Sequence, residues 1–444
     1  MTSSADVRYA RSRDGVDIGY QVRGDGPIDI VFVPGFVSHL DLLWEIPTFA
    51  EIGDRLAAMG RVVTFDKRGT GVSDRTLGFG SLEERMHDIG AVMDAAGVES
   101  AHLFGISEGG PLALLFAANQ PHRVSSVAVY GTFARLAEAP DFPEGLPQDL
   151  LDSLSPILEQ KWGSGTAMRF FIHHIPKTDD VRRAIARYER SACTPQMARH
   201  IIELNVAIDI RPVLPTVTVP TLVMHNEADP LIPVATARHL ADHLPDCRFT
   251  TRPHAFHASW NPADLWFLDE LEGFFAGGRP PRPTSRRTLA TVVFTDIVGS
   301  TEQAAALGDQ AWRTVLDRHD AACAEVVDRY GGHVVKSTGD GMLATFDSPS
   351  SGVECADELR RRLAGSGIRL RAGVHTGEVE VRGDDIGGIA VHIAARIAGL
   401  AADDRVWVSR TVKDLTAGSG LDLEPCGRHA LKGIDEEWDL YVLR

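Results

Sequence analysis

The sequence has few of the features that mark secreted, membrane or zinc-binding proteins. Its 444 residues include only five cysteines, and these are widely separated with no paired spacing: Cys193, Cys247, Cys323, Cys355 and Cys426. Such scattered thiols argue against a disulfide framework and a cysteine-based zinc site. No apolar run approaches the length of a membrane span, and residues 1–15 lack the apolar region of a secretory signal. We therefore expect a cytoplasmic protein with no membrane span.

The sequence also lacks an excess of positive charge, and its formal net charge is −16 at pH 7. Residues 1–287 contain 28 Lys and Arg against 36 Asp and Glu, and residues 288–444 contain 17 against 25. Each part therefore has a net charge of −8. Because neither part is basic, we expect no nucleic-acid partner. An anionic substrate would have to be held locally, by metal ions and a few cationic side chains.

The composition that is present is typical of folded domains. Hydrophobic residues make up 44% of a chain that is too long for one ordinary core. Segment 277–287, GGRPPRPTSRR, contains two glycines, three prolines and four arginines, which is typical of an exposed linker. We therefore predict one domain over residues 1–276 and a second over residues 288–444.

In the first domain, short apolar strands alternate with helical segments. Apolar runs at residues 28–33, 62–65 and 101–104 each lead into a turn, and residues 81–96 have helical spacing. Strands that alternate with helices predict an α/β fold with a parallel sheet.

The third of these strands leads into the sequence GISEGG, residues 105–110, and an apolar helix follows. A serine on a sharp strand-to-helix turn needs glycine on both sides, because the backbone is crowded there and the hydroxyl must stand clear. The pattern predicts a nucleophile elbow with Ser107 as the reactive residue. The alternative is a structural glycine turn.

Candidate partners for this serine follow later in the chain. The strand predicted at residues 221–225 is followed by Glu227 and Asp229, and further on the chain contains His254 and His257. Position alone leaves both acids and both histidines open.

The chain order of serine, acid and histidine is that of the α/β-hydrolases, and residues 7–276 resemble that family. The resemblance implies Ser107 as nucleophile, His257 as general base and Asp229 as the residue that orients the base. It also implies an oxyanion hole formed by the backbone N–H groups of Phe36 and Glu108.

Between residues 132 and 212 the strand pattern stops and helical runs replace it. This change predicts a helical lid over the hydrolase site. We expect a small ester or acyl ligand beneath it, although nothing in the lid sequence names that ligand.

The second domain opens with the stretch TVVFTDIVGST, residues 291–301, a predicted strand that delivers Asp296 to a turn. Residues 333–346 contain two apolar runs around a glycine-rich turn, which predicts a hairpin with Asp340 at its tip. Carboxylates on two neighbouring strand ends suit divalent ions, which bind oxygen ligands and leave positions open for phosphate.

These two stretches, followed by DIGGIAVHIAAR at residues 385–396, resemble the catalytic domain of class III nucleotide cyclases. The resemblance covers about the last third of the chain and implies an α+β, ferredoxin-like fold. It also implies conversion of ATP to 3′,5′-cyclic AMP and pyrophosphate, with two Mg²⁺ or Mn²⁺ ions per site. Asp296, Asp340 and the backbone carbonyl of Ile297 would hold the ions.

The same resemblance implies that Lys336 and Asp385 bind the purine. A lysine donor and an aspartate acceptor suit the edge of adenine, whereas guanine presents the opposite pattern, so we expect ATP rather than GTP. Asp384 is a neighbouring rival for Asp385, and spacing within the motif favours Asp385.

Two further cations are implied at the phosphates, and two positions depart from the family pattern. Arg396 would stabilise charge at the transferring phosphorus, and Lys432 would hold the β- and γ-phosphates. His392 stands where the family usually has asparagine, and we expect it to donate a hydrogen bond in a pH-sensitive site. Glu378 stands where some relatives have a phosphate-binding arginine.

Local patterns in the second domain predict further elements. They indicate one long helix over residues 301–330, a helix over residues 350–364, and two separate strands over residues 369–375 and 378–382.

We also expect a homodimer through the cyclase domain. Lys336 and Asp340 are too close in sequence to hold opposite ends of one nucleotide. The resemblance implies head-to-tail pairing of the catalytic domains. Each site would then take Asp296 and Asp340 from one protomer and the purine- and phosphate-binding residues from the other.

Two alternatives to an adenylate cyclase remain. One is a serine esterase whose cyclase-like module only senses nucleotide. The other is a non-enzymatic scaffold.

Overall fold

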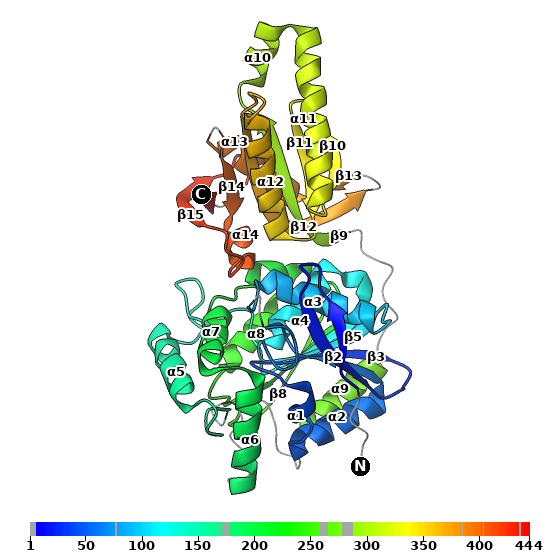
Figure 1. Ribbon diagram of the computed structural model, residues 1–444. Helices are drawn as coiled ribbons and strands as arrows, with labels where there is room; N and C mark the ends of the chain where they lie inside the picture. The colour runs from blue at the N-terminus through cyan, green and yellow to red at the C-terminus, as the bar shows by residue number, and fades with distance from the viewer. Residues whose placement is uncertain are drawn as a thin grey trace. The chain divides into compact units, whose positions relative to one another are not determined.

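The computed structural model describes residues 6–75, 78–168, 171, 178–257, 265–277, 287–382, 385–402, 404–434 and 437–444. The chain divides into two compact units, Met1–Thr284 and Ser285–Arg444 (Figure 1). This division falls within the predicted linker at 277–287, of which residues 278–286 lie outside the described part. Among the described residues, no helix combines the length and the apolar character needed to cross a membrane.

The N-terminal unit is built on an eight-stranded sheet in the order β1-β2-β4-β3-β5-β6-β7-β8. All neighbours from β4 to β8 pair in parallel, whereas β1 and β2 pair antiparallel at one edge. The predicted α/β fold is thus confirmed. The strands are β1 (Arg8–Arg11), β2 (Asp17–Arg23), β3 (Asp29–Val33), β4 (Arg61–Phe65), β5 (Ala101–Ile106), β6 (Val124–Tyr130), β7 (Thr221–Asn226) and β8 (Cys247–Arg252).

Helices cover both faces of this sheet. Helix α2 packs with α9, and α3 packs with α4 (Figure 1). Helix α4 is buried on every side, as expected for a helix that is apolar all round. The helices are α1 (Leu40–Leu43), α2 (Pro47–Met59), α3 (Leu82–Ala95), α4 (Gly109–Asn119), α8 (Val234–His243) and α9 (Trp266–Ala276).

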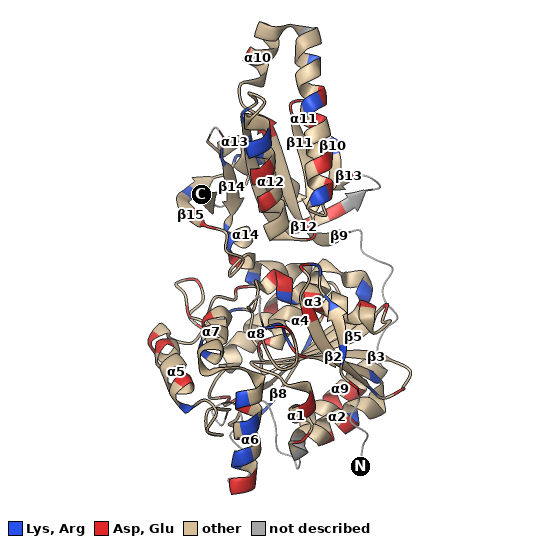
Figure 2. Ribbon diagram, viewed as in Figure 1, with Lys and Arg blue, Asp and Glu red and all other residues tan. Residues whose placement is uncertain are grey.

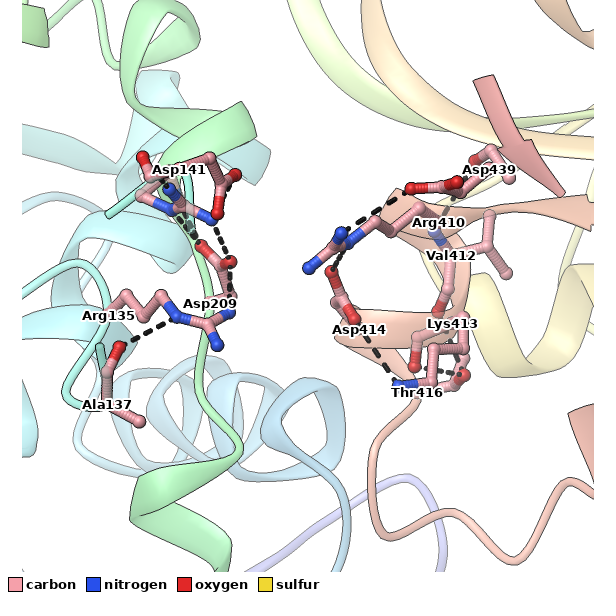
Figure 3. Close-up of polar contacts among 12 residues, drawn as sticks. Arg135, Ala137, Asp141, Asp209, Arg410, Val412, Lys413, Asp414, Thr416 and Asp439 are labelled. Atoms are coloured by element: carbon pink, nitrogen blue, oxygen red, sulfur yellow. Dashed lines mark hydrogen bonds and ion pairs between the residues drawn. The ribbon is translucent and has the colours of Figure 1, made fainter. Parts of the chain in front are cut away.

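Between β6 and β7 the described residues include the α-helices α5 (Gln148–Lys161), α6 (Asp179–Ala192) and α7 (Pro195–Val206), which pack over the sheet. The two ends of this insertion are joined to each other. Arg135 and Asp209 form an isolated antiparallel bridge, and Arg135 Nη1 lies 2.8 Å from Asp209 Oδ2 (Figure 3). Arg211 binds the same carboxylate at 2.8 Å. The helical insertion therefore leaves and rejoins the sheet at one fixed point.

The C-terminal unit has its own sheet, in the order β10-β11-β9-β12-β14-β16-β15, with β13 beside β12. One face packs on α11 and α12, and the other packs on α13. This mixed sheet with helices confirms the α+β class. The strands are β9 (Arg287–Ile297), β10 (His333–Ser337), β11 (Gly341–Phe346), β12 (Leu370–Arg382), β13 (Asp385–Gly387), β14 (Val406–Ser409), β15 (Leu423–Ala430) and β16 (Glu437–Leu443).

The helices of this unit are α10 (Ser300–Leu307), α11 (Asp309–Arg329), α12 (Pro349–Ala364), α13 (Ile389–Leu400) and α14 (Arg410–Leu415). Acidic and basic residues are mixed along α11 and α12 (Figure 2). Glu325 of α11, for example, accepts from Arg329 at 2.8 Å and from Arg362 of α12. These helices therefore present no surface of one charge sign.

Two predictions about this unit were wrong. The predicted helix over 301–330 is two helices, because Gly308 has φ of +75° and ends α10 before α11 begins. The predicted strands 369–375 and 378–382 are one strand, β12, because β9 is long enough to pair with it from Leu370 to Glu380.

Close packing of α13 on β12 generates a stability prediction. A Cβ at Gly373 would lie 2.2 Å from the backbone N of Ala398, whereas a Cβ at Gly399 would meet nothing within 4 Å. Gly373→Ala should force α13 away from the sheet and lower the free energy of local unfolding by about 1–3 kcal/mol. Gly399→Ala, within helix α13 itself, should leave stability unchanged or slightly increased. Hydrogen exchange of the β12 and α13 amides in the full chain measures the free energy of local unfolding in both variants. Equal protection in the two variants would contradict the close packing of α13 on Gly373.

Candidate active sites

The turn after β5 holds Ser107 in a conformation that few residues adopt. Ser107 has φ of 53°, a strained value for a residue other than glycine. Its backbone N donates to Tyr130 O at 2.9 Å, and its backbone O accepts from Thr132 Oγ1 at 2.6 Å. These bonds to the end of β6 and the turn after it fix the strained residue.

Glycines around this turn allow three backbone segments to meet. A Cβ at Gly109 would lie 2.2 Å from Val33 O, and a Cβ at Gly105 would lie 2.7 Å from Gly109 O. Neither position can therefore accept a side chain without moving the backbone. This strand–turn–helix geometry is that of a nucleophile elbow.

The hydroxyl of Ser107 lies at one end of a chain of hydrogen-bonding groups. Its Oγ is 3.1 Å from His257 Nε2, and His257 Nδ1 is 2.8 Å from Asp229 Oδ2. The other oxygen of Asp229 accepts from the backbone N–H groups of Leu231 and Ile232, at 2.8 and 3.0 Å. The structure thus joins a hydroxyl, an imidazole and a fixed carboxylate at catalytic distances.

Electrostatics keep the carboxylate of this chain ionised. Burial alone would raise the pKa of Asp229, but the charge and hydrogen bond of His257 more than offset burial, so the pKa lies below its usual value. An ionised Asp229 stabilises positive charge on His257 when the imidazole accepts a proton.

The two rival residues lie elsewhere. Glu227 is exposed and accepts from Thr251 Oγ1 at 2.8 Å. The ring of His254 stacks on Phe256, with centroids 4.9 Å apart. The structure therefore brings Asp229 and His257, rather than Glu227 and His254, to Ser107.

Two mainly apolar cavities meet at this serine. One is lined by residues that include Phe32, Leu43, Phe49 and Met168. The other is lined by residues that include Leu136, Leu146, Leu154 and Ile202. Ser107, His257, Phe36 and Phe171 line both cavities. Uncharged groups could therefore occupy both sides of a carbonyl at Ser107.

The residues predicted to form an oxyanion hole flank the serine. The loop after β3 approaches so closely that a Cβ at Gly35 would lie 3.3 Å from Ser107 Cβ. Within the described residues, the backbone N–H groups of Phe36 and Glu108 donate to no protein acceptor. Both donors are thus available to a ligand oxygen.

In the C-terminal unit, strand pairing brings the two predicted metal-binding aspartates together. Asp296 lies directly opposite Gly341 in the β9–β11 ladder, and Ile297 N donates to Asp340 O at 2.9 Å. A Cβ at Gly341 would lie 2.0 Å from Thr295 O, so only glycine permits this approach.

Arg371 is a neighbour of Asp296 that the sequence analysis missed. It lies opposite Asp296 in the β9–β12 ladder, and its Nε is 2.8 Å from Asp296 Oδ2. No local sequence signal links the two residues, because they are 75 positions apart and only the strand register joins them.

The residues present fit a divalent ion. Arg371 binds Asp296 through Oδ2, and Ser300 Oγ donates to Asp340 through Oδ2, so the Oδ1 atoms remain for an ion. Over the described residues, no group of three or more His, Cys, Asp or Glu side chains could hold a metal by itself. Two carboxylates and the Ile297 carbonyl match the way Mg²⁺ binds through few protein ligands and completes its shell with phosphate oxygens.

The two predicted purine-binding residues contact each other. Lys336 Nζ lies 2.7 and 2.6 Å from the two carboxylate oxygens of Asp385. The side chains are 48% and 52% exposed, so a ligand can reach both. The rival Asp384 lies outside the described residues.

The predicted phosphate-binding residues share one exposed region. His392 and Arg396 lie four residues apart and are exposed on α13, and Arg396 Nε donates to the backbone O of exposed Lys432 at 3.2 Å. Glu378 lies on β12 beside the start of α13, since a Cβ at Gly388 would lie 3.3 Å from Glu378 O. Arg371 is seven residues away on the same strand, or roughly 23 Å at the usual rise of a strand.

Comparisons with known proteins match each unit separately. Residues 29–264 match the family model described as serine aminopeptidase, S33, and residues 283–444 match the adenylate and guanylate cyclase catalytic domain. A putative carbamate hydrolase RutD from Azorhizobium caulinodans is 30% identical over 232 residues, which cover 50% of this chain and 83% of that protein.

A putative adenylate cyclase 3 from Rhizobium meliloti is 31% identical over 159 residues, which cover 34% of this chain and 27% of that protein. The chain thus spans about a quarter of that cyclase. Among solved structures, an esterase from Exiguobacterium antarcticum superimposes with a TM-score of 0.54 at 21% identity, covering 61% of this chain and 99% of that one. This likeness shows the fold of the N-terminal unit.

The geometry at Ser107 predicts a reactive hydroxyl. A fluorophosphonate probe should label the parent at Ser107, and Ser107→Ala should abolish the labelling. His257→Ala and Asp229→Asn should each slow the labelling at least about 100-fold, because proton removal from the serine depends on both residues. Glu227→Gln and His254→Asn are the matched controls and should label at the parent rate. Slow labelling of Glu227→Gln or His254→Asn would contradict the assignment of Asp229 and His257 as the partners of Ser107. Labelling of His257→Ala or Asp229→Asn at the parent rate would contradict it too.

Proposed function

Because the chain belongs to the serine aminopeptidase S33 family of α/β hydrolases and contains an adenylate and guanylate cyclase catalytic domain, we propose that it is an adenylate cyclase with an attached ester hydrolase. The observation that carries the cyclase function is the placement of Asp296 and Asp340 on adjacent strand ends of that domain.

The residues of the C-terminal unit would each have a separate role in cyclisation. Asp296, Asp340 and the Ile297 carbonyl would hold two Mg²⁺ or Mn²⁺ ions, and such ions would supply positive charge that favours ionisation of the ribose 3′-hydroxyl and departure of pyrophosphate. Arg371 holds one oxygen of Asp296 and so orients the other. Arg396 and Lys432 add positive charge along the phosphates, and His392 donates a hydrogen bond beside them.

The preference for ATP is proposed from the Lys336–Asp385 pair. Nζ of Lys336 donates to a ring nitrogen and the carboxylate of Asp385 accepts from the 6-amino group, once adenine separates the two side chains. Guanine would leave both groups wrongly paired, and unpaired polar groups discriminate strongly.

A second copy of the chain is proposed to complete each site. On the sheet face that α13 covers, Phe294, Val335, Ile386 and Val391 are only partly buried, and Ile389 is 57% exposed. A partly covered apolar surface beside the predicted substrate residues favours association with another protomer.

The cyclase function predicts product formation from ATP. Purified protein with Mn²⁺ should convert ATP to cyclic AMP, and kcat/KM for GTP should be lower. Asp296→Ala and Asp340→Ala should each lose at least about 100-fold in rate, because the ions lose a ligand. Asp317→Asn, which changes an exposed carboxylate on α11, is the control and should match the parent. No cyclic product from either nucleotide would refute the function.

If each site is shared between two protomers, two inactive variants should restore activity to each other when they are mixed. Asp296→Ala and Lys336→Ala should each be inactive alone. After equal mixing and subunit exchange, half of the dimers are hybrids with one intact site of two, so about a quarter of parent activity should return. Mixing Asp296→Ala with Asp340→Ala is the control, since both lie on the metal side and no hybrid site is intact. Lasting inactivity of the first mixture, despite demonstrated exchange, would contradict shared sites.

Ester hydrolysis by the N-terminal unit is the second candidate function, and the Ser107–His257–Asp229 distances favour it. Ser107 Oγ attacks the ester carbonyl while His257 Nε2 accepts its proton, and His257 then returns the proton to the leaving alkoxide. Water, deprotonated by His257, then attacks the carbonyl of the acyl-enzyme, and His257 returns this proton to Ser107 Oγ as the acid leaves.

The lining of both cavities predicts which esters are turned over. Uncharged esters with apolar groups on both sides of the carbonyl should have kcat/KM at least about tenfold above matched esters that carry a carboxylate, because an unpaired charge is costly in an apolar cavity. Ser107→Ala should remove the activity. A panel that shows no turnover, or equal turnover by Ser107→Ala, would make this unit a binding module.

A further inference from the structure

Behind the turn at Ser107 lies a buried cluster of ionisable side chains to which neither proposed reaction assigns a role. Lys67 Nζ is 2.6 Å from Glu108 Oε2, and Arg85 Nη1 is 2.5 Å from Glu108 Oε1. Asn205 of helix α7 also donates to Glu108, at 3.2 Å. All four side chains are buried, with residue exposures of 1–6%.

Lys67 also binds the loop that carries one of the predicted oxyanion donors. Its Nζ donates to the backbone O of Gly35 and, at 3.2 Å, to the backbone O of Phe36. The Gly35 carbonyl and the Phe36 N–H belong to one planar, trans peptide, so they point in opposite directions. When the ammonium holds the Gly35 carbonyl, it therefore also fixes the direction of the Phe36 N–H.

The same ammonium is tied to the second donor. Glu108, which binds Lys67 through its side chain, carries the other oxyanion N–H on its backbone. The three segments involved leave the sheet at the ends of β4, β3 and β5, which are neighbours in the order β4-β3-β5. One buried cation thus connects both donors across three adjacent strand ends.

Lys67 also brings a cationic group close to both donors. Glu108 is shared with a second cation, Arg85, and the neighbouring Arg68 is paired with Asp88 and Asp14. Fixed positive charge in a buried site stabilises negative charge that develops on a substrate oxygen.

We propose that Lys67 is a positioning residue that orients both oxyanion donors beside Ser107. Glu108 holds Lys67 through one carboxylate oxygen, and Arg85 binds the other. This inference rests on the proposed ester hydrolysis at Ser107. The cluster would stabilise the tetrahedral oxyanion and leave the binding of the uncharged substrate unchanged.

The test compares two ligands of one shape in Lys67→Met. A trifluoromethyl ketone adds to Ser107 and forms a tetrahedral oxyanion, whereas the corresponding secondary alcohol binds without one. The Kd for the ketone should rise at least about tenfold, since loss of one oxyanion donor costs roughly 100-fold or more in rate. The Kd for the alcohol should change less than about twofold. With an uncharged ester, kcat should fall while KM stays near the parent value.

Two further variants separate positioning from general stability. Lys67→Met/Arg85→Met/Glu108→Gln removes all three charges of the cluster, so no buried charge is left unpaired, and it should show the same loss for the ketone. Arg135→Met is the matched control: it removes one of two cations from buried Asp209, just as Lys67→Met removes one of two from Glu108. Its ratio of ketone to alcohol affinity should equal that of the parent.

The results distinguish the inference from the function on which it rests. If the parent neither cleaves esters nor binds the ketone, the proposed hydrolysis is wrong and the inference falls with it. If the parent does both, the inference alone is overturned by either of two results. The Lys67 variants bind the ketone and the alcohol more weakly by the same factor, or they bind both with the parent affinity.

Discussion

The antiparallel pairing of β9 with β11 determines where the acidic groups of the C-terminal unit lie. Asp296 is the last residue but one of β9, and its partner Gly341 follows Asp340 directly, so the register places both carboxylates at one corner of the sheet. A shift of one residue would move Asp296 to the opposite face, where α11 and α12 pack. The proposed metal site, and the orientation of nucleotide relative to the sheet, both depend on this register.

The N-terminal unit depends on a comparable close approach of backbones. Glycines at positions 35, 105 and 109 let the ends of β3 and β5 meet, and this contact leaves Ser107 with φ of 53°. The strain is held by hydrogen bonds to Tyr130 and Thr132 on one side and by the buried Glu108 cluster on the other. Ser107, the proposed nucleophile, and the groups that would stabilise its product are thus positioned by one crowded junction of strand ends.

The features that could be predicted from the sequence are local ones. The glycine-flanked turn at Ser107 and the hairpin that carries Asp340 have short-range signals. The fold class of the N-terminal unit followed from such patterns, and that of the C-terminal unit followed from the family resemblance. Arg371 and Lys67 were not predicted, because their partners are 75 and 41 residues away and are reached only through strand order and register. The end of α10 at Gly308 was missed because the apolar residues keep helical spacing on both sides of this glycine. The single strand β12 was predicted as two strands because its length depends on pairing with the long neighbouring strand β9.

The central claim is that one nucleotide lies between metal-binding residues of one protomer and purine-binding residues of another. The most direct measurement is a crystal structure of the full chain with Mn²⁺ and a non-cyclising ATP analogue, with the ions located by anomalous scattering. We expect two Mn²⁺ ions bound by Asp296 and Asp340, with the adenine between Lys336 and Asp385 of the second protomer. Ions bound elsewhere, or a nucleotide held entirely by one protomer, would contradict the account.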